Sequence, residues 1–180
     1  MRLTIRDKEP ESYGYTQNGE PIDYDTVMEL YHIAEDEILP KSDLAKQCNG
    51  DCTIDEYTFE YYQTGTAFGA KMNYVIDAGI KTSGGDLLDI YDFVTEYIEE
   101  EMHWDYNDPQ VTVDIDMEIK VNTDNCDTVV SNIYVYRKGR YSESESETLS
   151  RIFDYEKFGV YMNSIANQVA EEIHGRLSNI

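Results

Sequence analysis

Residues 111–121 alternate without exception between apolar and polar side chains. Apolar residues hold every odd position from Val111 to Val121, and polar residues hold every even position. A period of two predicts a β-strand with one buried face, because successive side chains of a strand point to opposite sides of the sheet. We therefore expect a core on one side of this strand and a row of carboxylates on the other.

The remaining periodicities predict an α+β fold in the order α-ββ-α-ββ-α. Strands are expected at 53–63 and 67–78, joined as a hairpin, and at 128–137, where a strand pairs with 111–121 as a second hairpin. Apolar residues that recur every three or four positions predict three helices. The first runs from Asp25 or Thr26 to Pro40, the second covers 86–102, and the third lies at the end of the chain and runs to about Leu177. Hairpins separated by helices favour an antiparallel sheet of at least four strands packed against three helices, with one sheet face free.

The chain is expected to form one domain over residues 1–180, of which 41% are hydrophobic. Residues 1–24 form an extension or a hairpin around the Asn18-Gly19 turn signal, with a short edge strand near Leu3. Thr26 and Glu29 fit a capping box at the start of the first helix. Residues 141–148 repeat Ser and Glu, a low-complexity composition that predicts a flexible acidic loop.

The charge balance restricts the class of partner. The chain has 37 Asp and Glu against 14 Lys and Arg, a formal net charge of -23. Such a surface repels nucleic acid and anionic membranes and attracts basic proteins. No stretch is long and apolar enough to span a membrane, there is no secretory signal, and three cysteines do not make a disulfide framework, so we expect a cytoplasmic protein.

The acids are concentrated in one segment. Residues 82–119 contain twelve Asp and Glu and no Lys or Arg. Acids on a strand recur about every 6.6 Å and acids on a helix about every 4.5 to 6 Å, rows of the order needed to imitate the charges of a nucleic-acid backbone. The candidate partner-binding residues are Asp89, Asp92, Glu96, Glu99, Glu100, Asp114, Asp116 and Glu118.

In its composition the chain resembles the small, strongly acidic inhibitors that phages direct against CRISPR or restriction enzymes. That resemblance implies a noncatalytic protein, without a cofactor, that mimics nucleic acid. It would occupy the basic channel of a nucleic-acid-binding nuclease of a defence system. The tyrosine content, sixteen against five phenylalanines and one tryptophan, also suits a surface for protein recognition.

Three alternatives remain open at the level of sequence. Glu118 and Lys120 share a strand face in the Glu-x-Lys pattern of metal-dependent nucleases, with Asp114 and Asp116 as possible further ligands. Against this, 83–119 supplies no basic group to grip phosphate. A phage structural or assembly protein is the second alternative. The third is a zinc site, whose ligands would be Cys48, Cys52, Cys126 and His103.

Overall fold

A computed structural model describes residues 2–4, 23–64, 67–83, 89–102, 110–122 and 125–177. Its strands form one antiparallel sheet in which every strand pairs with its neighbour in sequence, in the order β1-β2-β3-β4-β5-β6. The strands are β1 (Arg2–Thr4), β2 (Cys52–Thr64), β3 (Ala67–Ser83), β4 (Val111–Val121), β5 (Cys126–Arg137) and β6 (Arg140–Tyr141). The expected α+β class with an antiparallel sheet of at least four strands is confirmed.

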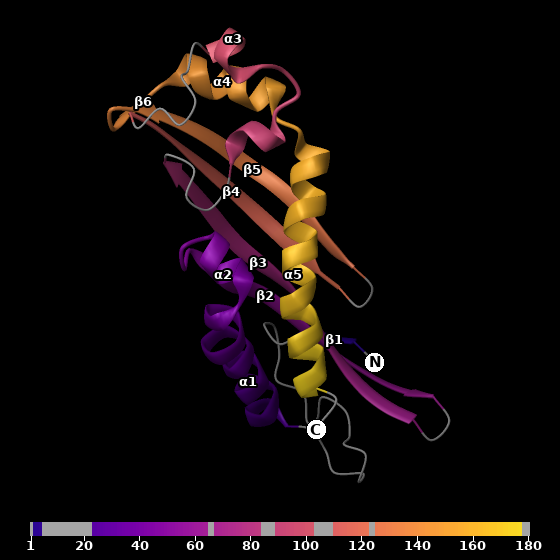
Figure 1. Cartoon of the computed structure of the whole chain (residues 1–180). Coiled ribbons are helices and arrows are strands. Elements are labelled where there is room, and N and C mark those ends of the chain that lie inside the picture. Colours follow the sequence, from indigo (N-terminus) through magenta and orange to yellow (C-terminus); the bar gives the residue numbers. More distant parts are fainter. Residues whose placement is uncertain are drawn as a thin grey trace.

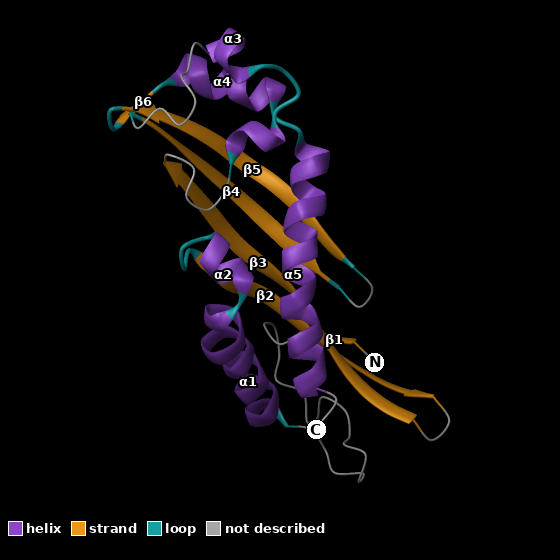
Figure 2. Cartoon of the chain, in the orientation of Figure 1, coloured by secondary structure: helices purple, strands orange, loops and turns teal. Residues whose placement is uncertain are grey.

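The helices are α1 (Tyr24–His32), α2 (Asp43–Gln47), α3 (Ile98–Met102), α4 (Glu143–Ile152) and α5 (Tyr155–Leu177). A π-helical turn over Ile33–Ile38 and a 3-10 turn over Leu39–Lys41 extend α1. Figures 1 and 2 show α1, α2 and α5 lying across one face of the sheet, with α3 and α4 grouped at one end of it. None of the helices in the described ranges combines the length and the apolar character needed to cross a membrane.

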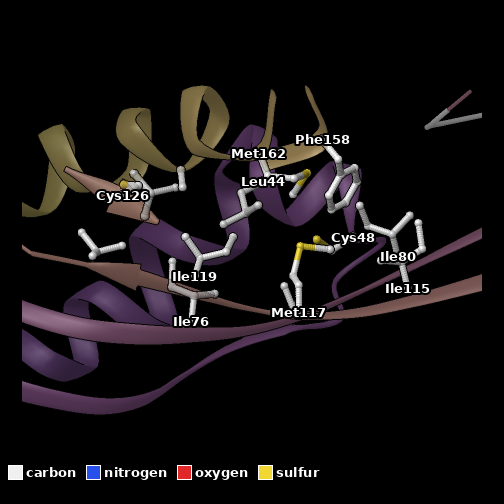
Figure 3. Packing of buried hydrophobic residues seen from close by; sticks show 14 of the residues in the cluster. Leu44, Cys48, Ile76, Ile80, Ile115, Met117, Ile119, Cys126, Phe158 and Met162 are labelled. Atoms are coloured by element: carbon white, nitrogen blue, oxygen red, sulfur yellow. The ribbon is translucent and has the colours of Figure 1, made fainter. Parts of the chain in front are cut away.

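The core lies between the sheet and α5. The odd-numbered residues of β4 are all buried, and Ile115 and Ile119 have no exposed surface. Phe158 and Met162 of α5 are equally buried and point toward these strand residues (Figure 3). Each such side chain contributes about 1.5 to 3 kcal/mol by leaving water, so this contact fixes which face of β4 is covered.

The start and end of the chain's helical layer agree closely with expectation. The closing helix ends at Leu177 as predicted, and its predicted apolar stripe is buried or packed against the core. The first helix is capped by Asp23 rather than by Thr26: the Asp23 carboxylate accepts a hydrogen bond of 2.9 Å from the Thr26 N–H. This bond lowers the pKa of Asp23 below its ordinary value. The predicted hairpin around Asn18-Gly19 lies outside the described residues.

The predicted long helix over 86–102 is wrong in its described part. Residues Ile90–Phe93 form a 3-10 turn, Val94 is extended and bridges to Phe153, and only Ile98–Met102 is α-helical. Phe93 packs edge-on against Phe158 with 5.4 Å between ring centroids. Tertiary contacts with α5 therefore override the helical spacing of the apolar residues.

The predicted flexible loop over 141–148 is also wrong, because most of it belongs to α4. Ser142 caps this helix by accepting a hydrogen bond from the Glu145 N–H. The Ser146 hydroxyl donates to the Ser142 carbonyl at 2.6 Å and accepts from the Val135 N–H at 2.8 Å. Leu149 is fully buried one turn later. A Ser-x-x-Glu cap followed by a buried residue every three positions is a helical pattern that the repetitive composition obscures.

Candidate functional site

The face of the sheet opposite the helices is the candidate site, and we call it the outer face. None of the described helices lies on it (Figure 1). Its residues follow from strand alternation and from the register of β3 to β6. They include Asp77, Gly79 and Lys81 of β3, Asp114, Asp116, Glu118 and Lys120 of β4, Asn132, Tyr134 and Tyr136 of β5, and Tyr141 of β6.

Asp51 and Asp116 approach Gly79, and Asp114 lies two residues from Asp116 on the same face of β4. We call Asp51, Asp114 and Asp116 the acidic cluster. The Gly79 N–H donates to the Asp51 carbonyl at 2.9 Å, which draws the loop before β2 against β3. A Cβ placed on Gly79 would lie 2.5 Å from Asp51 Oδ2 and 3.4 Å from Asp116 Oδ1. The absence of a side chain at this position therefore lets two carboxylates approach from opposite sides of the strand.

Asp114 has the most perturbed charge in the acidic cluster. Partial burial raises its pKa, and the neighbouring charges of Asp116 and Asp51 raise it further. Lys81, its register partner on β3, opposes this rise. One Asp114 carboxylate oxygen is buried without a hydrogen-bond partner. The ionised form of Asp114 is thus destabilised where it stands, and a cation placed nearby would stabilise it.

The outer face carries a further feature that the sequence did not single out, a group of three tyrosines. Tyr141 lies 5.9 Å, between ring centroids, from both Tyr134 and Tyr136, in tilted edge-to-face arrangements. Alternation had placed Tyr134, Tyr136 and Val130 together, but a bulge in β5 opposite the Asp116–Met117 step shifts the parity, so that Val130 packs against the core instead. Two signals in the sequence point to this group: the surplus of tyrosines, and the alternation that places Tyr134 and Tyr136 on one face of their strand.

The predicted site residues of the 86–102 segment do not share the outer face with β4. Asp89 accepts a hydrogen bond from the Tyr91 N–H at 3.0 Å and caps the 3-10 turn. Glu96 lies 3.4 Å from Arg151 of α4. Asp92 and Glu100 are exposed, and Glu99 belongs to α3. Hydrogen bonds from Thr95 to Ile152 and from Asp154 to Phe93 attach this segment to the helices. The acids expected to form one surface are therefore divided between two sides of the molecule.

Glu118 and Lys120, the pair in the nuclease pattern, are both exposed on the outer face. Their register partners on β3 are Asp77 and Val75. Within the described ranges, no group of three or more His, Cys, Asp or Glu side chains is arranged to hold a metal ion. The outer face as described therefore carries charged and aromatic side chains, and its described residues include no ligand set around which metal chemistry can be derived.

The three cysteines are free thiols, and Cys48 lies near enough to Cys52 for the two to interact electrostatically. Burial raises the pKa of Cys48 to about 12 and that of Cys126 to about 11. The Cys126 thiol donates to Asn167 Oδ1 at 3.1 Å, and Figure 3 shows it at the other end of the core from Cys48. Burial and the charge of Asp51 raise the pKa of Cys52 to about 11. The fourth zinc ligand considered, His103, lies outside the described residues.

No protein-family model, no curated protein and no solved structure matches the chain.

Proposed function

We propose that the chain is a noncatalytic binding protein that mimics nucleic acid and occludes the basic channel of a nucleic-acid enzyme. One observation carries the proposal: the outer face presents carboxylates that internal ion pairs leave available. In the described part of the chain, no Lys or Arg lies within salt-bridge distance of Asp114, Asp116 or Glu118. The ion pairs identified in that part involve other acids: Glu96 and Glu101 with Arg151, Glu145 with Arg137, Asp43 with Lys46, and Asp36 with His32 when His32 is protonated.

The sheet supports mimicry better than a single row of acids would. Along β4, carboxylates recur at about 6.6 Å, and neighbouring strands are about 4.8 Å apart. Asp51, across Gly79 from Asp116, adds negative charge beyond the single row of β4. A duplex presents one charge per about 1.7 Å of axis from two strands, so a protein needs more than one row to compete with it.

The proposed mechanism is steric and electrostatic, without a chemical step. Long-range attraction brings the acidic protein to a basic channel quickly, and the folded sheet then prevents nucleic acid from entering. Because exposed charges are screened by salt, we expect the complex to weaken steeply as ionic strength rises.

The test begins with a target. The protein is immobilised, a bacterial lysate is applied at low salt, and the enzymes eluted at high salt are purified. Each is then tested for competition between the protein and a labelled duplex or guide–target heteroduplex. We expect competitive displacement, and an enzyme that binds both ligands at once would contradict the proposal.

A matched pair of variants locates the interface. Asp114→Lys with Asp116→Lys reverses two charges on the outer face, and Asp92→Lys with Glu100→Lys makes the same charge change on the side of the helices. We expect the first variant to lose at least about tenfold in affinity and the second much less, since local complementarity matters more than net charge. Equal losses of affinity in the two variants would show that only the net charge of the protein matters and that the outer face is not the interface. Metal-dependent cleavage by the protein alone, abolished in Glu118→Ala, would support the nuclease instead.

A further inference from the structure

The three tyrosines of the outer face, which we call the tyrosine patch, form a continuous aromatic surface at one end of the sheet. Tyr141 is 53% exposed, and Tyr134 and Tyr136 are half-buried beneath it. Tyr136 of β5 pairs with Tyr141 of β6. The third ring, Tyr134, precedes Tyr136 by two residues and lies on the same face of β5. Because two strands hold the three rings, their side chains lose little conformational entropy when a partner covers them, and a small entropy loss favours binding.

The tyrosine patch adjoins carboxylates of β4, and Lys81 of β3 lies on the other side of Asp114 from the patch. Tyr134 is the register partner of Asp114, so their Cβ atoms lie about 4.5 to 5.5 Å apart. Asp116 follows two residues further along the same face. An aromatic surface that adjoins carboxylates can contact a cation through both ring and charge.

The basic residues of the nearby turn do not join this surface. Arg137 and Arg140 each alternate with a tyrosine of the tyrosine patch along their strands, so they point to the opposite side of the sheet. Arg137 is also paired with Glu145 of α4 at 2.7 Å. Arg137 and Arg140 therefore do not accompany the rings as phosphate-binding cations would, and Lys81 of the outer face lies opposite Asp114 on β3.

We propose that the tyrosine patch and Asp114 together form a site for arginine side chains of a protein partner. This inference rests on the proposed function and names the chemistry by which the basic channel is recognised. A guanidinium group can stack on a tyrosine ring while its planar fork of N–H donors engages the Asp114 carboxylate. A lysine ammonium supplies the charge but neither the stacking plane nor the fork, so the site distinguishes arginine from lysine.

The experiment compares two synthetic peptides, octa-arginine and octa-lysine, for binding to the full chain by isothermal titration calorimetry at one fixed ionic strength. We expect octa-arginine to bind roughly three- to tenfold more tightly than octa-lysine. Leucine at the three tyrosines (Tyr134→Leu, Tyr136→Leu, Tyr141→Leu) should remove most of this preference while octa-lysine binds almost as before. Phenylalanine at the same positions should retain it, because the ring face is kept.

The matched control is Tyr97→Leu, which removes a tyrosine that is 76% exposed but lies on the side of the helices. We expect the arginine preference to be unchanged in that variant. Circular dichroism and the melting temperature establish that the triple leucine variant is folded, and the single variant Tyr141→Leu, at the most exposed ring, provides the same test if the triple variant does not fold.

The outcomes separate this inference from the proposed function. Equal binding of the two peptides, or a preference insensitive to the tyrosines, would overturn the arginine site while leaving occlusion by the carboxylates intact. Conversely, if the unmodified chain prefers octa-arginine but Asp114→Lys with Asp116→Lys leaves enzyme inhibition unchanged, the proposed function alone is overturned. An arginine preference that persists in that double variant would remove Asp114 from the arginine site and overturn this inference. Binding of a single-stranded oligonucleotide of eight nucleotides in place of both peptides, lost in the leucine variant, would make the tyrosine patch a nucleic-acid site and overturn this inference.

Discussion

At the scale of single residues, Gly79 determines whether the acidic cluster can form. A Cβ there would lie 2.5 Å from Asp51 Oδ2, so the Asp51 carboxylate would have to move away from Gly79 and Asp116. We expect Gly79→Ala to lower the free energy of unfolding by about 1 kcal/mol, as an overpacked contact does. In an Asp51→Ala background the same change should be neutral or stabilising, because alanine suits a strand better than glycine. Urea denaturation of the four proteins in this cycle measures the coupling, and an equal cost in both backgrounds would refute the contact.

Asp114 gives a prediction about pH. Its folded pKa is raised by burial and by Asp116 and Asp51, so the folded state holds this proton more tightly than the unfolded state does. Stability is then lost as pH rises from the unfolded value through the raised pKa, and the whole penalty is present at neutral pH. We expect Asp114→Asn to raise the melting temperature at pH 7 by up to about 3 °C, and to have less effect near pH 4. Glu118→Gln, an exposed acid on the same strand, is the control for net charge. A gain that is independent of pH, or no larger than the control, would contradict the assignment.

At the scale of elements, α4 depends on one buried hydroxyl. Ser146 is 4% exposed, and its hydroxyl satisfies the Val135 N–H at the edge of the sheet. We expect Ser146→Ala to lower the free energy of unfolding by about 1 to 3 kcal/mol, since the Val135 N–H loses its partner. Ser144→Ala, an exposed position of the same helix, should change it by less than about 0.5 kcal/mol. Similar values for the two variants, measured by urea denaturation, would show that Ser146 is only a helix residue.

The same scale shows how far the sequence predicts the fold. β4 is predicted to the residue, and so is the end of α5, because each element buries one face along its length and the pattern of apolar residues records it. The segment 86–102 has an equally regular spacing, yet Phe93 is held by Phe158, far away in the chain, and the backbone follows that contact. The helix α4 was not predicted, for a different reason. Its buried residue Ser146 is polar and looks like a loop residue unless its hydrogen-bond partner on β5, Val135, is known.

At the scale of the whole molecule, part of the acidic surface is predicted by the sequence and part of it depends on tertiary contacts. Asp114, Asp116 and Glu118 were predicted to face away from the core, and they do, because strand alternation is local information. That Asp51 would join Asp116 across Gly79, and that Glu96 would turn to Arg151, depends on contacts between distant segments. The sequence therefore predicts half of the candidate face, and packing decides which other charges and aromatic rings accompany it.

The charge of the whole molecule predicts opposite effects of salt on folding and on binding. A net charge of -23 repels itself in the compact state, and salt screens that repulsion. We expect the melting temperature to rise by several degrees between about 0.01 and 0.5 M NaCl, over which the Debye length falls from about 30 Å to a few ångströms. The complex with a basic partner should weaken over the same range, because there screening removes an attraction. Asp114→Asn with Asp116→Asn and Glu118→Gln should reduce both slopes, and the slope of binding more, since these acids are a small part of the total charge but a large part of the outer face. A melting temperature that is flat or falling with salt, or a complex indifferent to it, would show that these charges are balanced locally and do not act as a surface.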